Sequence, residues 1–252
     1  MKILLNKILN FFGVIWNLFP NILRREILTL LLLLESRSYN LNGGIKNLFH
    51  FRDRLDWIIN ERAMKYGKGE HPKHRLIGYH NFFINRIKNG ERVLDIGCGY
   101  GAVAKSVAHS KPKSYVLGLD NDDKRLLQAQ NNSNLKNLNF INCDATKNIP
   151  TGKWDIVILS NVLEHIENRK QFLLDIQKTS LAPKFLIRVP LFERDWQMAL
   201  RKELGFNYFS DNDHKVEHTI NKFEEEIISS NLNINELITI WGEIWADCRL
   251  KS

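Results

Sequence analysis

Residues 93–101 read Val-Leu-Asp-Ile-Gly-Cys-Gly-Tyr-Gly, and this stretch decides the fold. Its apolar first half predicts a buried strand. The alternating glycines Gly97, Gly99 and Gly101 predict a turn in which the backbone can approach a ligand closely. A helix expected over residues 102–109 would add the partial positive charge of its N-terminus to that turn. The stretch therefore predicts a strand, a ligand-binding turn and a helix in succession.

The chain after this turn alternates between strand and helix patterns. We expect strands at Arg92–Ile96, Tyr115–Leu119, Leu138–Asn142, Asp155–Leu159 and Phe185–Val189, and helices at Ala102–His109, Asp123–Asn132 and Arg169–Thr179. Such alternation implies a parallel sheet covered by helices on both faces, an α/β Rossmann-like fold. A further helix is expected at Lys222–Ser229. Strands at Ile234–Trp241 and Glu243–Leu250 then form a terminal hairpin around Gly242.

Two parts of the chain are expected: a segment at residues 1–74 outside the core, and an α/β domain at residues 75–252. Residues 35–75 read as a connector of mixed helix, punctuated by Asn42-Gly43-Gly44. Apolar residues at three- and four-residue spacing predict one helix over Arg75–Ile87.

Residues 1–34 are unusually apolar. Polar residues interrupt the Ile3–Leu23 stretch, and Arg24, Arg25 and Glu26 separate it from the short apolar run Ile27–Leu34. Neither stretch has the roughly 20 uninterrupted apolar residues that cross a bilayer. No small-residue cleavage site of a signal peptide follows. Two alternatives stay open. One is a pair of helices packed against the core or a partner subunit. The other is an interfacial segment with the side chains Phe11, Phe12, Trp16, Phe19, Lys2, Lys7, Arg24 and Arg25 at the lipid headgroups.

Composition bounds the class of protein. The 252 residues are 44% hydrophobic and 25% charged, which is ordinary for a globular chain. Cys98, Cys143 and Cys248 form no CxxC or Cys/His cluster, so we expect reduced thiols in a cytoplasmic protein, with peripheral contact to the inner face of the membrane as an option. The net charge of +8 suits nucleic acid, acidic lipid or sugar phosphate, or reflects genome composition.

Acidic residues follow three successive predicted strands. The run from Gly97 to Ala102 also fits the dinucleotide pattern, but the carboxylate of Asp95 would repel a pyrophosphate at this turn. A carboxylate suits a cationic ligand with an amino acid moiety, which favours S-adenosylmethionine over NAD. Asp120 can accept hydrogen bonds from both ribose hydroxyls, and Asp144 from the adenine amino group.

Residues 154–166 read Trp-Asp-Ile-Val-Ile-Leu-Ser-Asn-Val-Leu-Glu-His-Ile. With the segments above, this run resembles class I S-adenosylmethionine-dependent methyltransferases of the small-molecule branch that includes ubiquinone-biosynthesis O-methyltransferases. The resemblance covers about residues 75–252. It implies a seven-stranded sheet with an antiparallel last strand and S-adenosyl-L-methionine as cofactor. The cofactor-binding residues that it implies are Asp95, Gly97, Gly99, Gly101, Asp120, Asp144, Asn161 and Leu163.

His165 is the catalytic candidate, because an imidazole near neutral pKa can take the proton of an attacking hydroxyl. The alternative is a histidine that only packs locally. Loops after strand ends build substrate pockets in open sheets. The predicted substrate residues are His80, Arg188, Asp195, Trp196 and His214, and His71, His74, Arg75 and Tyr79 are candidates for a lid. The acidic and histidine residues at 211–218 follow no recognised ligand spacing, so no metal is predicted.

The predicted function is methyl transfer to a hydroxyl of a sugar, glycan or other small acceptor. Residues 71–75 and 189–196 are similar to methyltransferases of bacterial surface-polysaccharide pathways, which supports this acceptor class. Lipid or quinone O-methylation is the alternative, followed by a non-catalytic cofactor-binding subunit. Nucleic acid is an unlikely partner, because no Asn/Asp-Pro-Pro-aromatic motif follows the fourth strand. The oligomeric state stays open.

Overall fold

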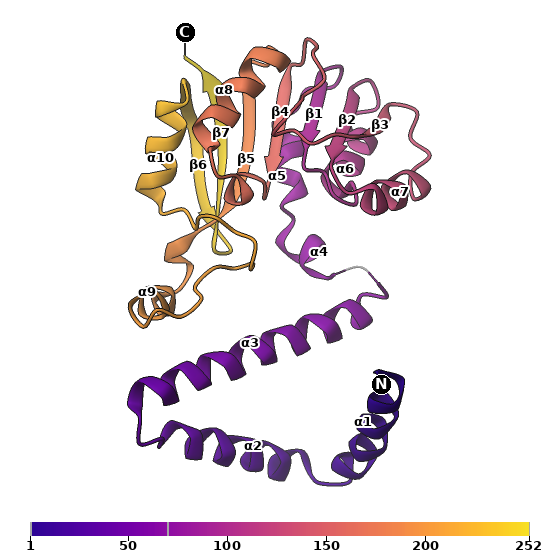
Figure 1. The fold of residues 1–252 in the computed structure, drawn as a ribbon. Helices are drawn as coiled ribbons and strands as arrows, with labels where there is room; N and C mark the ends of the chain where they lie inside the picture. The colour runs from indigo at the N-terminus through magenta and orange to yellow at the C-terminus, as the bar shows by residue number, and fades with distance from the viewer. Residues whose placement is uncertain (1, 70, 252) are drawn as a thin grey trace. The chain divides into compact units, whose positions relative to one another are not determined.

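The computed structural model describes all residues except 1, 70 and 252 (Figure 1). Its internal contacts divide the chain into two units, Met1–His71 and Pro72–Ser252. The second unit contains a seven-stranded sheet: β1 (Arg92–Ile96), β2 (Tyr115–Asp120), β3 (Leu138–Asn142), β4 (Ile156–Ser160), β5 (Lys184–Pro190), β6 (Leu232–Ile240) and β7 (Glu243–Leu250). Figure 1 shows the strands side by side in the order β3-β2-β1-β4-β5-β7-β6. Strand β7 runs antiparallel to both of its neighbours, and the other pairs are parallel. The predicted Rossmann-like sheet is confirmed.

Helices cover both faces of this sheet. One hydrophobic cluster joins the strands to α8 (Arg169–Ser180) and α10 (Ile220–Ser229) through Phe172 and Phe223. The opposite cluster joins them to α5 (His80–Asn85), α6 (Ala102–Ser110) and α7 (Asp123–Asn131). Strand β5 has a fully buried pattern, as expected of a strand covered on both sides.

The chain places β2 and β3 on one side of β1, and β4 and β5 on the other, so the strand order reverses beside β1. Ile96 at the end of β1 pairs with Leu119 of β2 and with Leu159 of β4. The residues that follow these three strands therefore lie side by side at one edge of the sheet. Ligands bind at such a reversal in open α/β sheets.

Three predictions of local structure are wrong. The helix predicted at Arg75–Ile87 is two short helices, α4 (Lys73–Ile77) and α5, because Gly78 adopts a left-handed φ of 63° and ends the first. The break predicted at Asn42-Gly43-Gly44, within the connector of mixed helix, is wrong, because the 26-residue helix α3 (Leu41–Tyr66) runs through it. Its two glycines lie in the first turn, where the side chain of Asn40 accepts a hydrogen bond from Gly43 N.

The third difference lies after β5, where loops were expected. There the chain forms the one-turn helix η2 (Phe192–Arg194) and the helix α9 (Trp196–Glu203). A further one-turn helix, η1 (Leu163–His165), follows β4. Asp195 begins α9, since its side chain accepts a hydrogen bond from Gln197 N at 3.1 Å.

The first unit consists of α1 (Lys2–Asn17), α2 (Asn21–Ser36) and α3. Asn47 of α3 donates a hydrogen bond to Glu35 of α2 at 2.7 Å. Within the described part of the chain, every helix is too short or too polar to cross a membrane.

Candidate functional site

A hollow of about 260 Å³ lies at the edge where β1, β2, β3 and β4 end. Five of the predicted site residues line it: Gly97, Asp120, Asp144, Asn161 and His165. The other predicted cofactor residues, Asp95, Gly99, Gly101 and Leu163, lie in the same segments but do not line the hollow. The structure thus brings together residues that are up to 68 positions apart in the sequence.

The glycine turn has the backbone that the sequence predicts. Gly97 has a φ of 69°, and a Cβ there would lie 2.7 Å from Val162. Gly99 also has a positive φ, of 55°, but a Cβ there would meet open space. Its N–H donates to Asp120 Oδ2 at 2.7 Å, which ties the turn to the end of β2. The turn therefore leaves room for a ligand directly beside its backbone.

Two buried polar atoms at this edge are unpaired among the described residues: Oδ2 of Asp95 and Oδ1 of Asn161. Burial raises the pKa of Asp95 to about 7, against a hydrogen bond from the backbone of Ala104 that lowers it. A buried carboxyl with a free oxygen gains most from a cationic ligand that takes its charge. The residues present therefore fit a ligand that carries an ammonium group.

The two other strand-end carboxylates differ in their surroundings. Both oxygens of Asp120 accept backbone hydrogen bonds, from Gly99 and from Asp122 N at 3.0 Å. Asp144 is more exposed, and its hydrogen bonds with Lys147 and Thr146 lower its pKa to about 2. Both groups line the hollow as acceptors, and Asp144 is ionised at neutral pH.

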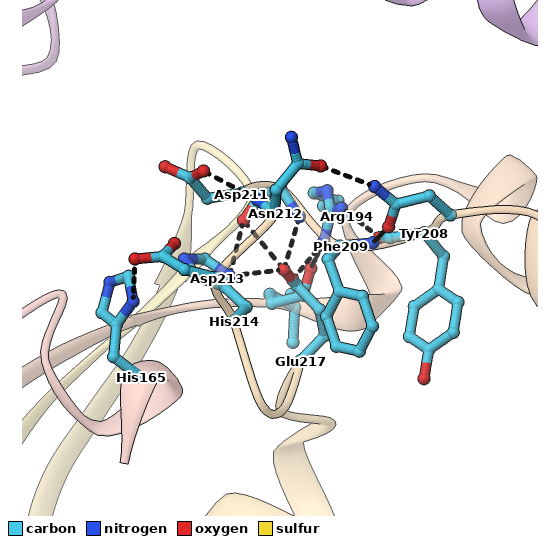
Figure 2. A network of polar contacts seen from close by, with 12 residues as sticks. His165, Arg194, Tyr208, Phe209, Asp211, Asn212, Asp213, His214 and Glu217 are labelled. Atoms are coloured by element: carbon cyan, nitrogen blue, oxygen red, sulfur yellow. Dashed lines mark hydrogen bonds and ion pairs between the residues drawn. The ribbon is translucent and has the colours of Figure 1, made fainter.

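His165 lies on η1, directly after β4, and points toward Asp213 (Figure 2). Its Nδ1 lies 3.1 Å from Asp213 Oδ2. Since a carboxylate only accepts hydrogen bonds, Nδ1 carries the proton and Nε2 keeps a lone pair. Partial burial lowers the pKa of His165, although Asp213 acts in the opposite direction. The imidazole is therefore neutral at pH 7 and able to accept a proton.

The loop that carries Asp213 is held by a buried polar network (Figure 2). His214 Nδ1 lies 2.9 Å from Glu217 Oε1, and Arg194 donates to Glu217 Oε2 at 2.5 Å. Burial lowers the pKa of His214, but the hydrogen bond with Glu217 and the nearby Glu164 outweigh it, so the net shift is upward. His214, predicted to contact substrate, is 8% exposed and serves this network.

Three potential metal ligands lie close together although the sequence predicts no metal. One atom each of Glu164, His165 and His214 lies within 4.8 Å of the other two. Both carboxyl oxygens of Glu164 are buried without a partner among the described residues, and burial raises its pKa to about 8. Glu164 is therefore protonated at neutral pH, and a protonated carboxyl is a poor metal ligand.

Arg188, predicted to contact substrate, is 7% exposed and makes two hydrogen bonds with Glu243, one of them at 2.6 Å. Its guanidinium also lies 4.0 Å from the ring centroid of Tyr79. Trp196 is 73% exposed at the start of α9. The Nδ1 atom of His80 lies 2.8 Å from Ser106 Oγ, and His80 lines a different hollow, beside α6.

Sequence reasoning missed the apolar and loop residues of the site. Val162, Ile166 and Phe172 line the hollow of about 260 Å³ together with Asp213. Ile166 follows η1 and Phe172 lies on α8, and their direction depends on how these two elements pack. Asp213 was noted only as part of an acidic cluster, and its contact with His165 spans 48 residues.

A larger hollow of about 710 Å³ adjoins the first, and the two share five lining residues. The shared residues are Ala145, Thr146, His165, Ile166 and Phe172. The rest of the larger hollow is rich in hydrogen-bonding side chains: Lys147, Asn148, Glu167, Asn168, Gln171, Asp175, Lys178, Thr179 and Lys215. His165 thus lies between two spaces, each of which can hold a small ligand.

Residues 87–231, more than half of the chain, match the family described as a methyltransferase domain. The chain therefore belongs to this methyltransferase family. It is 28% identical over 149 residues to malonyl-[acyl-carrier protein] O-methyltransferase 2 of Ilyobacter polytropus, which covers 57% of each chain. It is 31% identical over 99 residues to a probable (S)-tetrahydroprotoberberine N-methyltransferase of Papaver bracteatum, which covers 37% of this chain and 28% of the relative.

Solved structures share the fold at low identity. Magnesium protoporphyrin IX methyltransferase of Synechocystis PCC 6803, solved with bound SAH, superposes with a TM-score of 0.52 and 17% identity, over 70% of this chain and 78% of that one. The chain spans between about a quarter and a little over half of the length of the first curated relatives that it matches. These relatives include both N- and O-methyltransferases.

Proposed function

We propose that this chain is an S-adenosylmethionine-dependent methyltransferase that methylates a hydroxyl of a sugar, glycan or similar small acceptor. The observation that carries the proposal is the neutral imidazole of His165, which lines both adjoining hollows. The relatives and the neighbour with bound SAH support the cofactor.

The cofactor supplies an electrophilic methyl group on a positively charged sulfur. The open backbone at Gly99 and the buried carboxyl of Asp95 would hold its amino acid end, and Asp120 and Asp144 would accept hydrogen bonds from its ribose and adenine. An ammonium group beside Asp95 would favour the ionised carboxylate and lower the pKa that burial has raised.

His165 removes the proton of the acceptor hydroxyl. The acceptor oxygen would take the methyl group that the cofactor supplies, and the hydroxyl proton would pass to Nε2 of His165. Asp213 accepts the Nδ1–H hydrogen bond and stabilises the imidazolium that results. Alignment of the hydroxyl with the methyl group in the enclosed site contributes the rest of the rate.

The larger hollow supports a hydroxylated acceptor. Amides such as Asn168 and Gln171 and the ammonium groups of Lys178 and Lys215 line it. These groups can donate to and accept from several hydroxyls at once, which an apolar pocket cannot do. The two lysines also suit an acceptor with a phosphate or carboxylate. A lipid or quinone acceptor is the second candidate, favoured by the exposed apolar side chains of α2.

The proposal is tested with methyl-labelled S-adenosylmethionine and three acceptor sets: glycan and sugar-phosphate fractions, lipid and quinone fractions, and primary and secondary amines. We expect label in the first set, and carbon NMR of the product should show a methoxy carbon. A labelled N-methyl product would refute O-methylation, and label confined to the lipid set would favour the second candidate.

His165→Asn keeps a hydrogen-bond donor near Asp213 but removes the base. We expect kcat to fall roughly 10²- to 10⁴-fold while the cofactor Kd changes little. His109→Asn, on the exposed end of α6, is the matched control and should leave kcat unchanged. Near-normal turnover of His165→Asn would exclude the base role. If a chelator abolishes turnover of the wild-type chain, His165 acts beside a cation rather than as the base.

A further inference from the structure

Helices α1 and α2 carry a large exposed apolar surface. Between residues 9 and 34, fifteen Leu, Ile, Val and Phe side chains are at least 42% exposed. Helix α2 has no buried residue at all among its sixteen. Exposed apolar surface on this scale marks a surface that binds a partner or a membrane.

Each helix has a continuous apolar face. In α1, Asn10, Gly13 and Asn17 follow at three- and four-residue spacing and so share one face. In α2, Leu23, Ile27, Leu30 and Leu34 follow at three- and four-residue spacing and share one apolar face. Such helices suit an orientation in the plane of a membrane surface, with the apolar face inserted.

The charge of this unit suits anionic lipid. Residues 1–71 contain eleven Lys and Arg against six Asp and Glu, so this quarter of the chain carries +5 of the net +8. A hollow of about 490 Å³ is lined by Trp16, Asn21, Arg24, Arg25 and Leu28. Two nitrogens of Arg24 donate to Asn17 and Asn21, while its Nε is buried without a partner among the described residues.

An indole beside two guanidinium groups is the arrangement expected where a helix lies at the headgroup level, because Trp prefers the interface and Arg pairs with lipid phosphate. We propose that α1 and α2 bind the surface of an anionic phospholipid bilayer, with their apolar faces inserted and Arg24 and Arg25 at the headgroup phosphates. Each helix has sixteen residues, fewer than the roughly 20 that span the hydrocarbon core.

The proposal is tested by flotation of the full chain with vesicles of phosphatidylcholine alone, or with roughly one-third phosphatidylglycerol. We expect binding to the anionic vesicles that weakens as salt increases, and weaker binding to the neutral ones. The assay needs no acceptor, so its failure leaves the proposed methyl transfer untouched.

Matched variants separate insertion from charge. Leu30→Asn with Leu34→Asn places amides on the apolar face of α2 and should weaken vesicle binding roughly tenfold or more. Leu127→Asn, a 56% exposed leucine on α7, is the control and should bind as the wild-type chain does. Arg25→Gln should weaken binding to the anionic vesicles about fivefold and change binding to neutral vesicles less.

A second measurement does not depend on how the leucine variants fold. Brominated lipid should quench the fluorescence of Trp16 in the anionic vesicles, and Trp16→Phe should lose that quenching. Absence of wild-type binding to the anionic vesicles would overturn the proposal. So would a stable dimer in light scattering that dissociates on Leu30→Asn and Leu34→Asn while no vesicle binding occurs, because a second copy would then cover these helices.

Discussion

Replacing Asp95 by Asn should change cofactor affinity and protein stability in opposite directions. Asp95 is 1% exposed, and burial raises its pKa to about 7. Asparagine has nearly the same shape and can still accept the hydrogen bond from Ala104 N. The variant therefore removes the charge without opening a cavity.

The loss of affinity follows from the charge. A buried hydrogen bond to a charged group contributes about 1.5–3 kcal/mol, so Asp95→Asn should weaken S-adenosylmethionine binding roughly 10- to 150-fold. The gain in stability follows from the pKa. In the unfolded chain Asp95 ionises near 3.8 and in the folded chain near 7, so the native state binds the extra proton between these pH values.

Stability that depends on this proton is fully present below pH 3.8 and is lost as pH rises through about 7. About three pKa units correspond to ~4 kcal/mol at most. Asp95→Asn does not ionise, so it should be more stable than the wild-type chain at pH 8, by up to that amount, and similar to it near pH 4.

Isothermal titration with S-adenosylmethionine at pH 8 measures the first effect, and urea unfolding at pH 4 and pH 8 measures the second. Asp155→Asn is the control, since Asp155 accepts a hydrogen bond from Arg92 N at the opposite end of the strands. It should leave the Kd unchanged. Unchanged affinity of Asp95→Asn would refute its place in the cofactor site, and lower stability at pH 8 would refute the electrostatic argument.

Three further substitutions test how residues around the site contribute to stability. Glu164→Gln should be similar to the wild-type chain in stability near pH 4 and exceed it at pH 9 in urea unfolding, because burial raises the pKa of Glu164 from 4.5 to about 8 and the stability tied to its proton is lost as pH rises through about 8. Gly97→Ala should lower Tm more than Gly205→Ala, since both have positive φ but only the first would press a Cβ against a neighbour. Glu243→Gln should cost about 3 kcal/mol by leaving a buried arginine without its counterion, against less than about 1 kcal/mol for the exposed Glu236→Gln.

The sequence predicts the catalytic unit well because its signals are local. The glycine turn follows the end of β1, where the backbone must approach a ligand. The acidic residues likewise stand at the ends of β2 and β3. These features are visible in consecutive residues. The parallel order of strands then follows from the alternation with helices.

The errors arise where a local signal competes with context. Asn42-Gly43-Gly44 reads as a break, yet α3 tolerates glycine in its first turn, where the Asn40 cap satisfies a backbone N–H. Within Arg75–Ile87 the apolar period continues across Gly78, but the left-handed φ of that residue ends the helix. In both places the low helix propensity of glycine and the surrounding helical pattern predict different structures. The hydrogen bonds at the helix ends determine which of the two forms.

The candidate base depends on contacts that no local pattern contains. His165 follows β4, whereas Asp213, which holds its tautomer, belongs to a loop beyond α9. That loop is fixed through Glu217, which is fully buried and accepts from Arg194 of η2. It is also joined to η1 by the backbone, because Lys215 N donates to Glu164 O at 2.7 Å. A change anywhere in this chain of contacts would therefore alter the orientation of the imidazole while the glycine turn stays intact. In the proposed mechanism, cofactor binding and proton transfer therefore rest on separate parts of the fold: the first on the ends of β1, β2 and β3, and the second on η1 and the loop after α9.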